Sequence, residues 1–421
     1  MEKYSTYKDS GVQWLGQIPS HWSINRLASY FTERKTKVSD KDFAPLSVTK
    51  MGILPQLENV AKTDDGDNRK LVKVNDFVIN SRSDRRGSSG VSPMDGSVSL
   101  INIVLSPRPG INPSFCNYLL KSYAFIEEFY RNGHGIVADL WTTRYDEMKM
   151  IKICIPPYKE QEAIVAYLDA ATAKIDEAIA QQQRMIELLN ERKGIIINHA
   201  VTKGIHKGVT LKDSGYDWIG QIPSHWKIIK TSYVFTHIGS GTTPSSSRED
   251  YYTEDGIYFL QTGDLNDGYV IDTSKKLTEK ALRDTGLTVY PKGSLVIAMY
   301  GATIGKLGIL GIETTVNQAC CVLPETSIMN TRYAFYVFSA AKNDLIQQSK
   351  GGGQPNISQD TIRNERIIVP PIEEQTEIAN FIDSICIPIE TAIQNANSLI
   401  DRLQERKQII INEVVTGKVK V

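Results

Sequence analysis

The sequence predicts an α+β protein in which two globular α/β domains are separated by an antiparallel coiled coil of two long helices, with a pseudo-two-fold internal repeat. Three observations support this fold class. An apolar seam with heptad spacing runs from Glu160 to Ala200, and the same seam returns between Glu374 and Val414. Each copy follows a region of short apolar runs bounded by turn residues, which is typical of a mixed α+β domain.

The first long helix is predicted between Glu160 and Ala200. Pro156 and Pro157 precede it, where a missing backbone donor does no harm, and Gly204 follows it. At ~1.5 Å per residue such a helix is roughly 60 Å long, so its seam needs a partner. The predicted seam residues of the two helices are Leu168, Ile175, Ile179, Ile186, Leu189, Ile196, Ile382, Ile389, Ile393, Ile400, Leu403 and Ile410.

The second long helix carries the same motifs at its ends. Pro-Pro-x-x-Glu-Gln at residues 156–161 returns at 370–375, and Glu-Arg-Lys-x-Ile-Ile-Ile-Asn at 191–198 returns at 405–412. The two helices are therefore expected to pair within one chain. Pro388 lies inside the second copy, where we expect a kink or a short break.

A second repeat opens each half of the chain. Residues 9–22 return as residues 213–226, and we call each of these segments a clip. Turn-forming residues surround Trp14 and Trp218, which are expected to supply apolar area for docking. The histidine near the end of each clip could be catalytic, but no nucleophile pattern accompanies it, so a docking role is favoured.

Between clip and long helix the two halves differ in sequence. Residues 24–155 and 228–369 both alternate short apolar runs with turn residues. The expected strands are at 75–80, 99–105, 294–298 and 318–323, and the expected helices are at 113–130 and 331–349. A repeated clip and long helix that carry two domains of different sequence suit a protein that recognises two different targets.

The composition limits the class of protein. The chain has 421 residues, and its 48 basic and 48 acidic side chains give a net charge of zero, which argues against coating nucleic acid by bulk charge. We expect neither a membrane span nor a signal peptide. The five scattered cysteines suit a reduced cytoplasmic protein, and the six histidines lack the spacing of metal ligands.

The clip and both end motifs of the long helices resemble the hallmarks of specificity (S) subunits of type I restriction-modification enzymes. The resemblance covers the whole chain and implies target-recognition domains at 1–155 and 204–369 and long spacer helices at 156–203 and 370–421. It implies a non-catalytic subunit that binds double-stranded DNA and docks two modification (methyltransferase) subunits. S-adenosylmethionine, ATP and Mg²⁺ are then expected on the modification and the restriction (motor-nuclease) subunits, with none on this chain.

Two stretches look catalytic but lack the necessary residues. Ile-Pro-Pro-Tyr at 155–158 has isoleucine where an amino-methyltransferase needs Asn or Asp to hold the amino group of a flipped base. Gly-Ala-Thr-Ile-Gly-Lys-Leu at 301–307 has three spacers where a phosphate-binding loop has four, and leucine where Mg²⁺ chemistry needs Ser or Thr. We expect a helix start and a turn between strands.

DNA contacts are predicted on polar loops of the two variable domains. Arginine forks suit guanine edges and phosphates, glycines permit close approach, and amide side chains can pair with adenine. For the first domain the predicted residues are Arg82, Ser83, Arg85, Arg86, His134, Thr142 and Arg144. For the second domain they are Thr242, Thr243, Arg248, Gln261, Thr303, Lys306, Lys350, Gln354, Asn356 and Ser358, and two of its loops, at 240–244 and 351–358, also resemble the family.

The sequence therefore favours a DNA-recognition subunit whose unlike domains contact an asymmetric bipartite site with an unread spacer. Two alternatives stay open: a coiled-coil scaffold that never touches bases, and a methyltransferase that acts unaided. The isolated chain could be monomeric or could dimerise through its clips.

Overall fold

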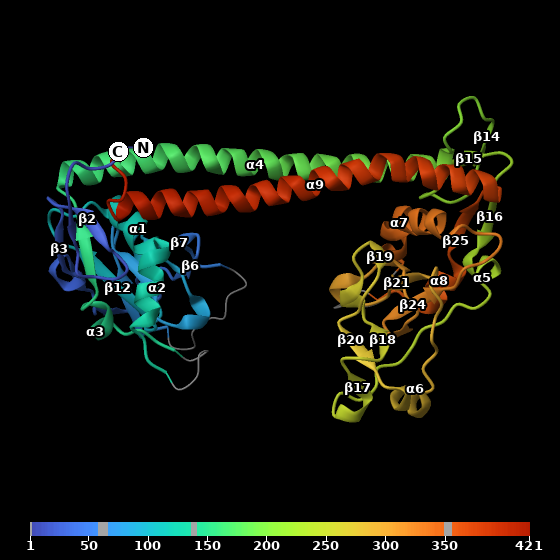
Figure 1. The fold of residues 1–421 in the computed structure, drawn as a ribbon, viewed down its shortest axis with the longest axis horizontal. Helices are drawn as coiled ribbons and strands as arrows, with labels where there is room; N and C mark the ends of the chain where they lie inside the picture. Colours follow the sequence, from blue (N-terminus) through green and yellow to red (C-terminus); the bar gives the residue numbers. More distant parts are fainter. Residues whose placement is uncertain (1, 58–65, 136–140, 349–355) are drawn as a thin grey trace. The chain divides into compact units, whose positions relative to one another are not determined.

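The structure is a computed structural model that describes residues 2–57, 66–135, 141–348 and 356–421. It divides into two compact units. Unit 1 contains Met1–Gln183 and Asn397–Val421, and unit 2 contains Arg184–Ala396. Each unit holds one α+β domain together with one part of each long helix (Figure 1), so the predicted fold class is confirmed.

The two long helices are α4 (Tyr158–Lys203) and α9 (Ile372–Val415). In unit 1 the first part of α4 packs against the last part of α9, and in unit 2 the last part of α4 packs against the first part of α9. This pairing is antiparallel. Every predicted seam residue is buried or half-buried.

Two lysines that interrupt the apolar seam form ion pairs between the helices. The Nζ of Lys193 lies 2.6 Å from Oε1 of Glu390, and the Nζ of Lys407 lies 2.7 Å from Oδ1 of Asp176. Because these groups are partly exposed, each pair contributes at most ~1 kcal/mol. Each pair links a lysine of the seam to an acid on the other helix and so contributes to the pairing of α4 with α9.

We expected a kink or a short break at Pro388, and the short break does not occur, since α9 continues through this residue (Figure 1). Proline removes one helical hydrogen bond, which leaves the carbonyl of Ser384 without its usual donor. Both residues are exposed, so water can bind this carbonyl and the helix can continue.

A four-stranded antiparallel sheet, ordered β10-β9-β12-β4, forms the centre of the unit 1 domain. The elements are β4 (Phe31–Glu33), β9 (Phe77–Asn80), β10 (Ser89–Val91), β12 (Asn102–Pro107), α1 (Pro113–Lys121) and α2 (Tyr123–Arg131). Phe77, Phe115 and Phe129 are fully buried in one core between the sheet and the helices. The helix predicted at 113–130 is two helices, because Ser122 ends α1 and caps α2.

Smaller elements complete unit 1. A three-stranded sheet contains β5 (Lys37–Val38), β8 (Arg69–Val72) and β11 (Gly96–Val98). The strand pairs are β1 (Tyr7–Asp9) with β2 (Gln17–Pro19), β3 (Ser23–Arg26) with β13 (Lys152–Ile155), and β6 (Leu46–Thr49) with β7 (Gly52–Pro55). The short helices are η1 (Leu27–Ser29), η2 (Ser83–Arg85) and α3 (Tyr145–Met148).

The unit 2 domain is built around a sheet ordered β19-β22-β21-β24. Its elements are β19 (Gly268–Val270), β21 (Leu295–Ala298), β22 (Leu307–Leu310), β24 (Cys320–Leu323) and the helix α7 (Thr331–Gln347). A second sheet contains β17 (Tyr252–Thr253), β18 (Ile257–Leu260), β20 (Lys275–Leu277) and β23 (Thr315–Val316). The remaining elements are β14 (Leu211–Asp213), β15 (Gln221–Pro223), β16 (Lys227–Lys230), β25 (Arg366–Val369), α5 (Thr231–Val234), α6 (Glu279–Thr285), α8 (Gln359–Asn364), η4 (Glu249–Tyr251), η5 (Thr262–Asp264) and η6 (Gly301–Thr303).

The two variable domains share a scaffold despite their unlike sequences. The order strand, 3₁₀ turn, strand occurs as β9-η2-β10 in unit 1 and as β21-η6-β22 in unit 2, and all three elements are offset by the same distance along the chain. The left-handed glycine of each turn, Gly87 (φ 80°) and Gly305 (φ 73°), lies at the same offset. The strands β12 and β24 and the helices α1 and α7 begin at this offset too. The repeat therefore extends into the regions that the sequence suggested were unrelated.

Candidate DNA interface

In unit 1, Glu160 on the first turn of α4 ties the clip to the long helix. Its Oε2 lies 2.8 Å from Nε2 of His21, and its Oε1 accepts hydrogen bonds from Nε1 of Trp22 (3.0 Å) and the hydroxyl of Tyr4 (2.5 Å). The ring of Trp22 is fully buried against the end of α9. These contacts explain why a clip must carry His-Trp and a long helix must begin with Pro-Pro-x-x-Glu.

Unit 2 repeats this arrangement. Glu374 at the start of α9 lies 2.8 Å from Nε2 of His225 and accepts a hydrogen bond of 2.8 Å from Nε1 of Trp226. The second tryptophan of each clip is therefore the buried docking residue. Trp14 and Trp218, for which we expected this role, are half-buried and also pack against the cores of their units.

Burial opposes ionisation of Glu160 and Glu374, but the hydrogen bonds outweigh it. The donors are Tyr4, His21 and Trp22 for the first carboxylate and Trp226 and His225 for the second, and they hold the pKa of each carboxyl below its ordinary value of 4.5. Both groups therefore act as hydrogen-bond acceptors at neutral pH. This is the behaviour of a structural anchor.

The next residue of the same motif fixes the variable domain. In unit 1, Oε1 of Gln161 accepts from the backbone N–H of Asn112 (2.8 Å), and Nε2 donates to the carbonyls of Gly110 and Pro156. Asn112 in turn caps α1. The buried glutamine thus joins the long helix to the first helix of the domain.

In unit 2, Gln375 makes the same three contacts. Its Oε1 accepts from the N–H of Asn330 (2.8 Å), and its Nε2 donates to the carbonyls of Ile328 and Pro370. Asn330 caps α7. Each variable domain is consequently attached to the long helices by the same glutamate and glutamine pair.

The structure brings three predicted DNA contacts of the first domain together. Arg82 and His134 both form bridges with Thr142, and the backbone groups of His134 and Thr142 exchange two hydrogen bonds of 3.0 Å. Arg82 and His134 are exposed. Loops that are distant in sequence therefore present polar side chains at one end of the sheet.

Other predicted residues of the first domain have structural partners. Arg86 pairs with Glu127 and lies over the ring of Tyr130, 5.4 Å from its centroid. Arg144 caps α3, and Ser83 lies at the start of η2. The side chain of Arg85 is 67% exposed beside Asp84, so it is more available to a phosphate than Arg86.

In the second domain the structure brings Thr243 and Asn356 to one end of the central sheet. The hydroxyl of Thr243 donates to Oε1 of Gln318 over 2.5 Å, and Asn356 forms a bridge with Tyr300. All four side chains are exposed. Gln318 and Tyr300 were not predicted, although each of them is equivalent in the repeat to an exposed residue of the first domain.

The remaining predicted residues of the second domain have other surroundings. Arg248 makes a two-pronged ion pair with Asp250 and lies over Tyr251, 4.4 Å from the ring centroid. Gln261 precedes η5, Thr303 bonds to the carbonyl of Tyr300, Lys306 contacts the carbonyl of Leu265, Ser358 caps α8, and Thr242 is exposed. Lys350 and Gln354 lie outside the described residues.

The described residues contain no group of three or more His, Cys, Asp or Glu side chains arranged to hold a metal ion. No helix within this part of the chain is long and apolar enough to cross a membrane. The five cysteines are buried, and burial raises the pKa of the Cys154 thiol to about 12, so none offers a reactive thiolate.

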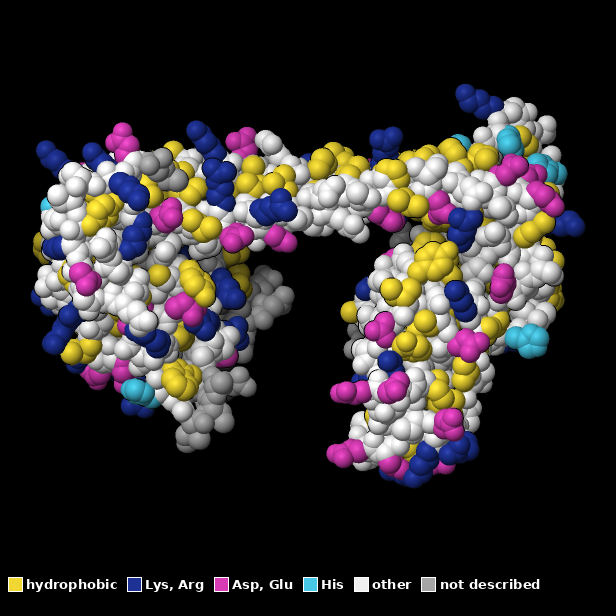
Figure 2. All heavy atoms as spheres, in the orientation of Figure 1, with side chains coloured by type: hydrophobic (Ala, Val, Ile, Leu, Met, Phe, Trp, Pro, Cys, Tyr) yellow, Lys and Arg dark blue, Asp and Glu magenta, His cyan; other side chains and the backbone are white. Residues whose placement is uncertain are grey.

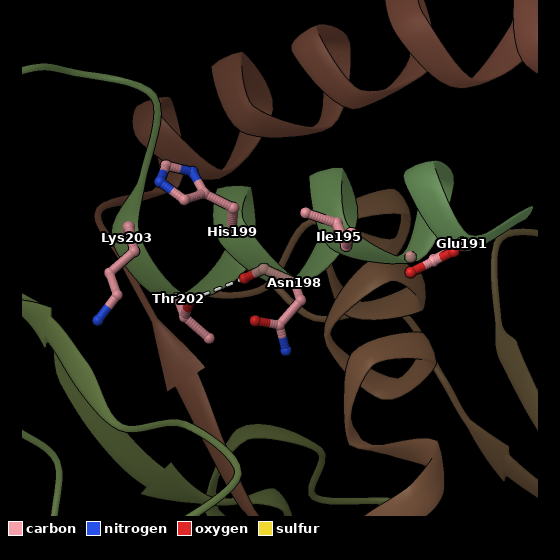
Figure 3. A pocket seen from close by; sticks show the side chains of 7 residues that line it. Glu191, Ile195, Asn198, His199, Thr202 and Lys203 are labelled. Atoms are coloured by element: carbon pink, nitrogen blue, oxygen red, sulfur yellow. Dashed lines mark hydrogen bonds between the residues drawn. The ribbon is translucent and has the colours of Figure 1, made fainter. Parts of the chain in front are cut away.

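The long helices also have an exposed apolar face. On α4, Met185, Leu188 and Ile195 are 39%, 48% and 62% exposed. Ile195 lies in a shallow pocket of about 450 Å³ with Gly194, whose missing side chain leaves open space (Figure 3). Figure 2 shows hydrophobic side chains along these helices, while acidic and basic groups are mixed over the domains.

Comparisons with known proteins give one consistent result. A family model described as the type I restriction modification DNA specificity domain matches residues 223–397. The putative type I restriction enzyme MjaX specificity subunit of Methanocaldococcus jannaschii is 24% identical over 438 residues, which cover 97% of this chain and 96% of that protein. The EcoKI specificity subunit of Escherichia coli K12 is 20% identical over 440 residues, which cover 96% and 90%.

A solved structure confirms the fold over the whole chain. It is described as the structural basis of complex assembly and conformational transition of the type I R-M system, and it superposes with a TM-score of 0.71 at 17% identity, covering 96% of this chain and 99% of its own. Residues 223–397 therefore match the DNA specificity domain of type I restriction-modification systems, and almost the whole chain is similar to specificity subunits of type I restriction enzymes.

Proposed function

We propose that this subunit recognises an asymmetric bipartite DNA site, with one half contacted by each variable domain and an unread spacer between them. The observation that carries the proposal is the combination of one repeated scaffold with two different sets of exposed side chains. Each domain is attached to the same pair of helices through an identical Glu-Gln anchor. Helices that continue through both units would keep the spacing of the two half-sites constant.

The exposed apolar face of the long helices supports docking of two modification subunits. Ile195 and Ile409 are equivalent positions of the repeat and are 62% and 48% exposed, and the corresponding pair Met185 and Leu399 is 39% and 43% exposed. Exposed aliphatic side chains at equivalent positions mark a surface for a partner. Because the surface occurs twice, it would bind two copies of one partner.

The methyl donor, ATP and Mg²⁺ would then be bound by partner subunits. The chain would contribute sequence recognition, with the modification subunits transferring methyl groups and the restriction subunits translocating and cutting DNA. A zero net charge is compatible with this division, because partner subunits could supply part of the phosphate contacts.

Selection of bound sequences from a random DNA library tests the proposal. The complex of this chain with its modification subunits should enrich two short unlike motifs at one fixed separation, with binding that weakens as salt rises. Binding of DNA without any sequence preference, or enrichment of a single continuous motif, would contradict the proposal.

A further inference from the structure

Four segments of the unit 2 domain meet at one end of its central sheet. Met299 donates its backbone N–H to the carbonyl of Ala319 (2.8 Å), and its own carbonyl accepts from the N–H of Ile357 (2.9 Å). The N–H of Gly241 donates to the carbonyl of Asn317. These bonds fix the neighbouring residues Tyr300, Gln318, Asn356 and Thr243, which we call cluster 2.

Cluster 2 has the chemistry of a base-contact surface. Its members are exposed, and each carries a hydroxyl or an amide. Gln318 is held by Thr243, whose hydroxyl donates to Oε1. This hydrogen bond orients the amide while its two N–H donors and a second lone pair on Oε1 stay available.

The backbone supports close approach at this point. A Cβ on Gly241 would lie 1.6 Å from the carbonyl oxygen of Val316, so only glycine can bring this loop against the turn that carries Gln318. Gly301 adopts a left-handed conformation (φ 68°) directly after Tyr300. Backbone geometry therefore sets where the residues of the cluster lie, and the Thr243 hydroxyl orients the amide of Gln318.

The first domain has an equivalent set, which we call cluster 1. At the offset that relates the two scaffolds, Arg82 corresponds to Tyr300 and Leu100 to Gln318, and at the offset of the long helices Thr142 corresponds to Asn356. The same backbone bonds recur: the N–H of Thr143 donates to the carbonyl of Ser81 (3.0 Å), as Ile357 does to Met299, and Arg82 bridges Thr142.

The two clusters differ while the scaffold beneath them does not. Some buried strand positions keep the same residue, as at Val78 and Val296 or Leu105 and Leu323, all 0% exposed, whereas others, such as Phe77 and Leu295, differ but stay apolar. In contrast, the three matched cluster positions change from arginine to tyrosine, from leucine to glutamine, and from threonine to asparagine. Different polar chemistry at the exposed end of a common backbone scaffold is expected where each copy contacts a different ligand.

We infer that Gln318 is a specificity-determining residue that contacts a base edge, with Tyr300 and Asn356 beside it, and that Leu100 occupies the equivalent position in the first domain. This inference rests on the proposed function. Glutamine and asparagine pair best with adenine through its N6 and N7 groups. The half-site contacted by unit 2 therefore contains an A·T pair at the position of Gln318.

The test is site selection and affinity measurement with the complete complex carrying Gln318→Ala or Gln318→Arg. The alanine variant should lose about 10- to 100-fold discrimination at one base pair of one half-site, and the arginine variant should prefer G·C at that same pair. Because Gln318 is uncharged, the slope of log affinity against log salt should not change in the alanine variant. Gln394→Ala, on an exposed part of α9, is the matched control and should change none of these quantities.

The outcomes separate the inference from the proposed function. Unaltered base preference at every position in both Gln318 variants, or an equal loss over both half-sites, overturns the inference. If the unmodified complex shows no sequence preference, the proposed function itself fails. A variant that keeps its preference for the other half-site is folded. If the alanine variant is unstable, the base preference of Gln318→Arg alone tests whether Gln318 contacts a base.

Discussion

The buried glutamine that joins each variable domain to the long helices gives a sharp test of how the frame holds the domains. Replacing Gln375 with alanine removes three hydrogen bonds, to the N–H of Asn330 and to the carbonyls of Ile328 and Pro370. Gln375 is fully buried. Each lost hydrogen bond leaves a backbone N–H or C=O group without its partner, which costs about 1 kcal/mol or more. We therefore expect about 3 kcal/mol of local destabilisation at the start of α7.

Hydrogen exchange measured by mass spectrometry reports this local free energy. A loss of about 3 kcal/mol corresponds to about a 100-fold fall in the protection of amides in the first turns of α7. Protection of α1 in unit 1 should stay unchanged, because its own anchor, Gln161, is intact.

Gln394→Ala on the same helix is the control, since its side chain is exposed. Protection of α7 that changes less than about threefold in Gln375→Ala, or that falls equally in α1, would refute the idea that this glutamine is the local anchor.

Three further predictions concern the clips, the seam and the exposed face. Folding lowers the pKa of Glu374, so the ionised carboxylate contributes its full stabilisation above pH ~4.5. This stabilisation is lost as the pH falls through the lower pKa of the folded state. Melting measured at several pH values should therefore show less acid destabilisation of unit 2 in Glu374→Gln. Ile382→Ala removes a side chain that is 0% exposed and should cost about 2 to 5 kcal/mol in denaturant unfolding, whereas Ile409→Ala, at a position that is 48% exposed, should cost less than about 1 kcal/mol. Ile195→Asp should reduce the number of bound modification subunits from two to one in native mass spectrometry, and unchanged stoichiometry would exclude this face from docking.

Periodicity predicted the long helices because a seam that must stay buried over many turns constrains every third or fourth residue. The burial of Ile175, Ile382 and Ile410 follows directly from that constraint. The short break was wrongly expected at Pro388 because periodicity does not reveal that this residue is exposed, where the unpaired carbonyl can be hydrated.

The contact clusters were only partly predictable. Loop composition indicated Arg82, Thr243 and Asn356, because glycines and polar side chains are visible in a sequence. Gln318 and Tyr300 lie in turns of ordinary composition, and only strand pairing brings them to the same end of the sheet. Aligning the two domains at their constant offset could have indicated Gln318 and Tyr300. That alignment is hard to find in the sequence, because few residues are identical between the two domains.

Two of the predicted arginines have structural partners in place of a free donor group. Arg86 and Arg248 were chosen for their donors, yet each is bound to a carboxylate and lies over a tyrosine ring. A sequence shows that an arginine is present, whereas the acid that neutralises it depends on the fold.

The spacer length of the recognised site tests most directly whether the helix pair sets the separation of two independent recognition domains. Inserting one heptad into each long helix, after Gln183 in α4 and after Ala396 in α9, keeps the seam in register and lengthens the pair by about 10 Å. Site selection with the resulting complex should return both half-sequences unchanged, with a spacer longer by about three base pairs at ~3.4 Å each. An unchanged spacer with altered half-sequences would contradict this view of the molecule.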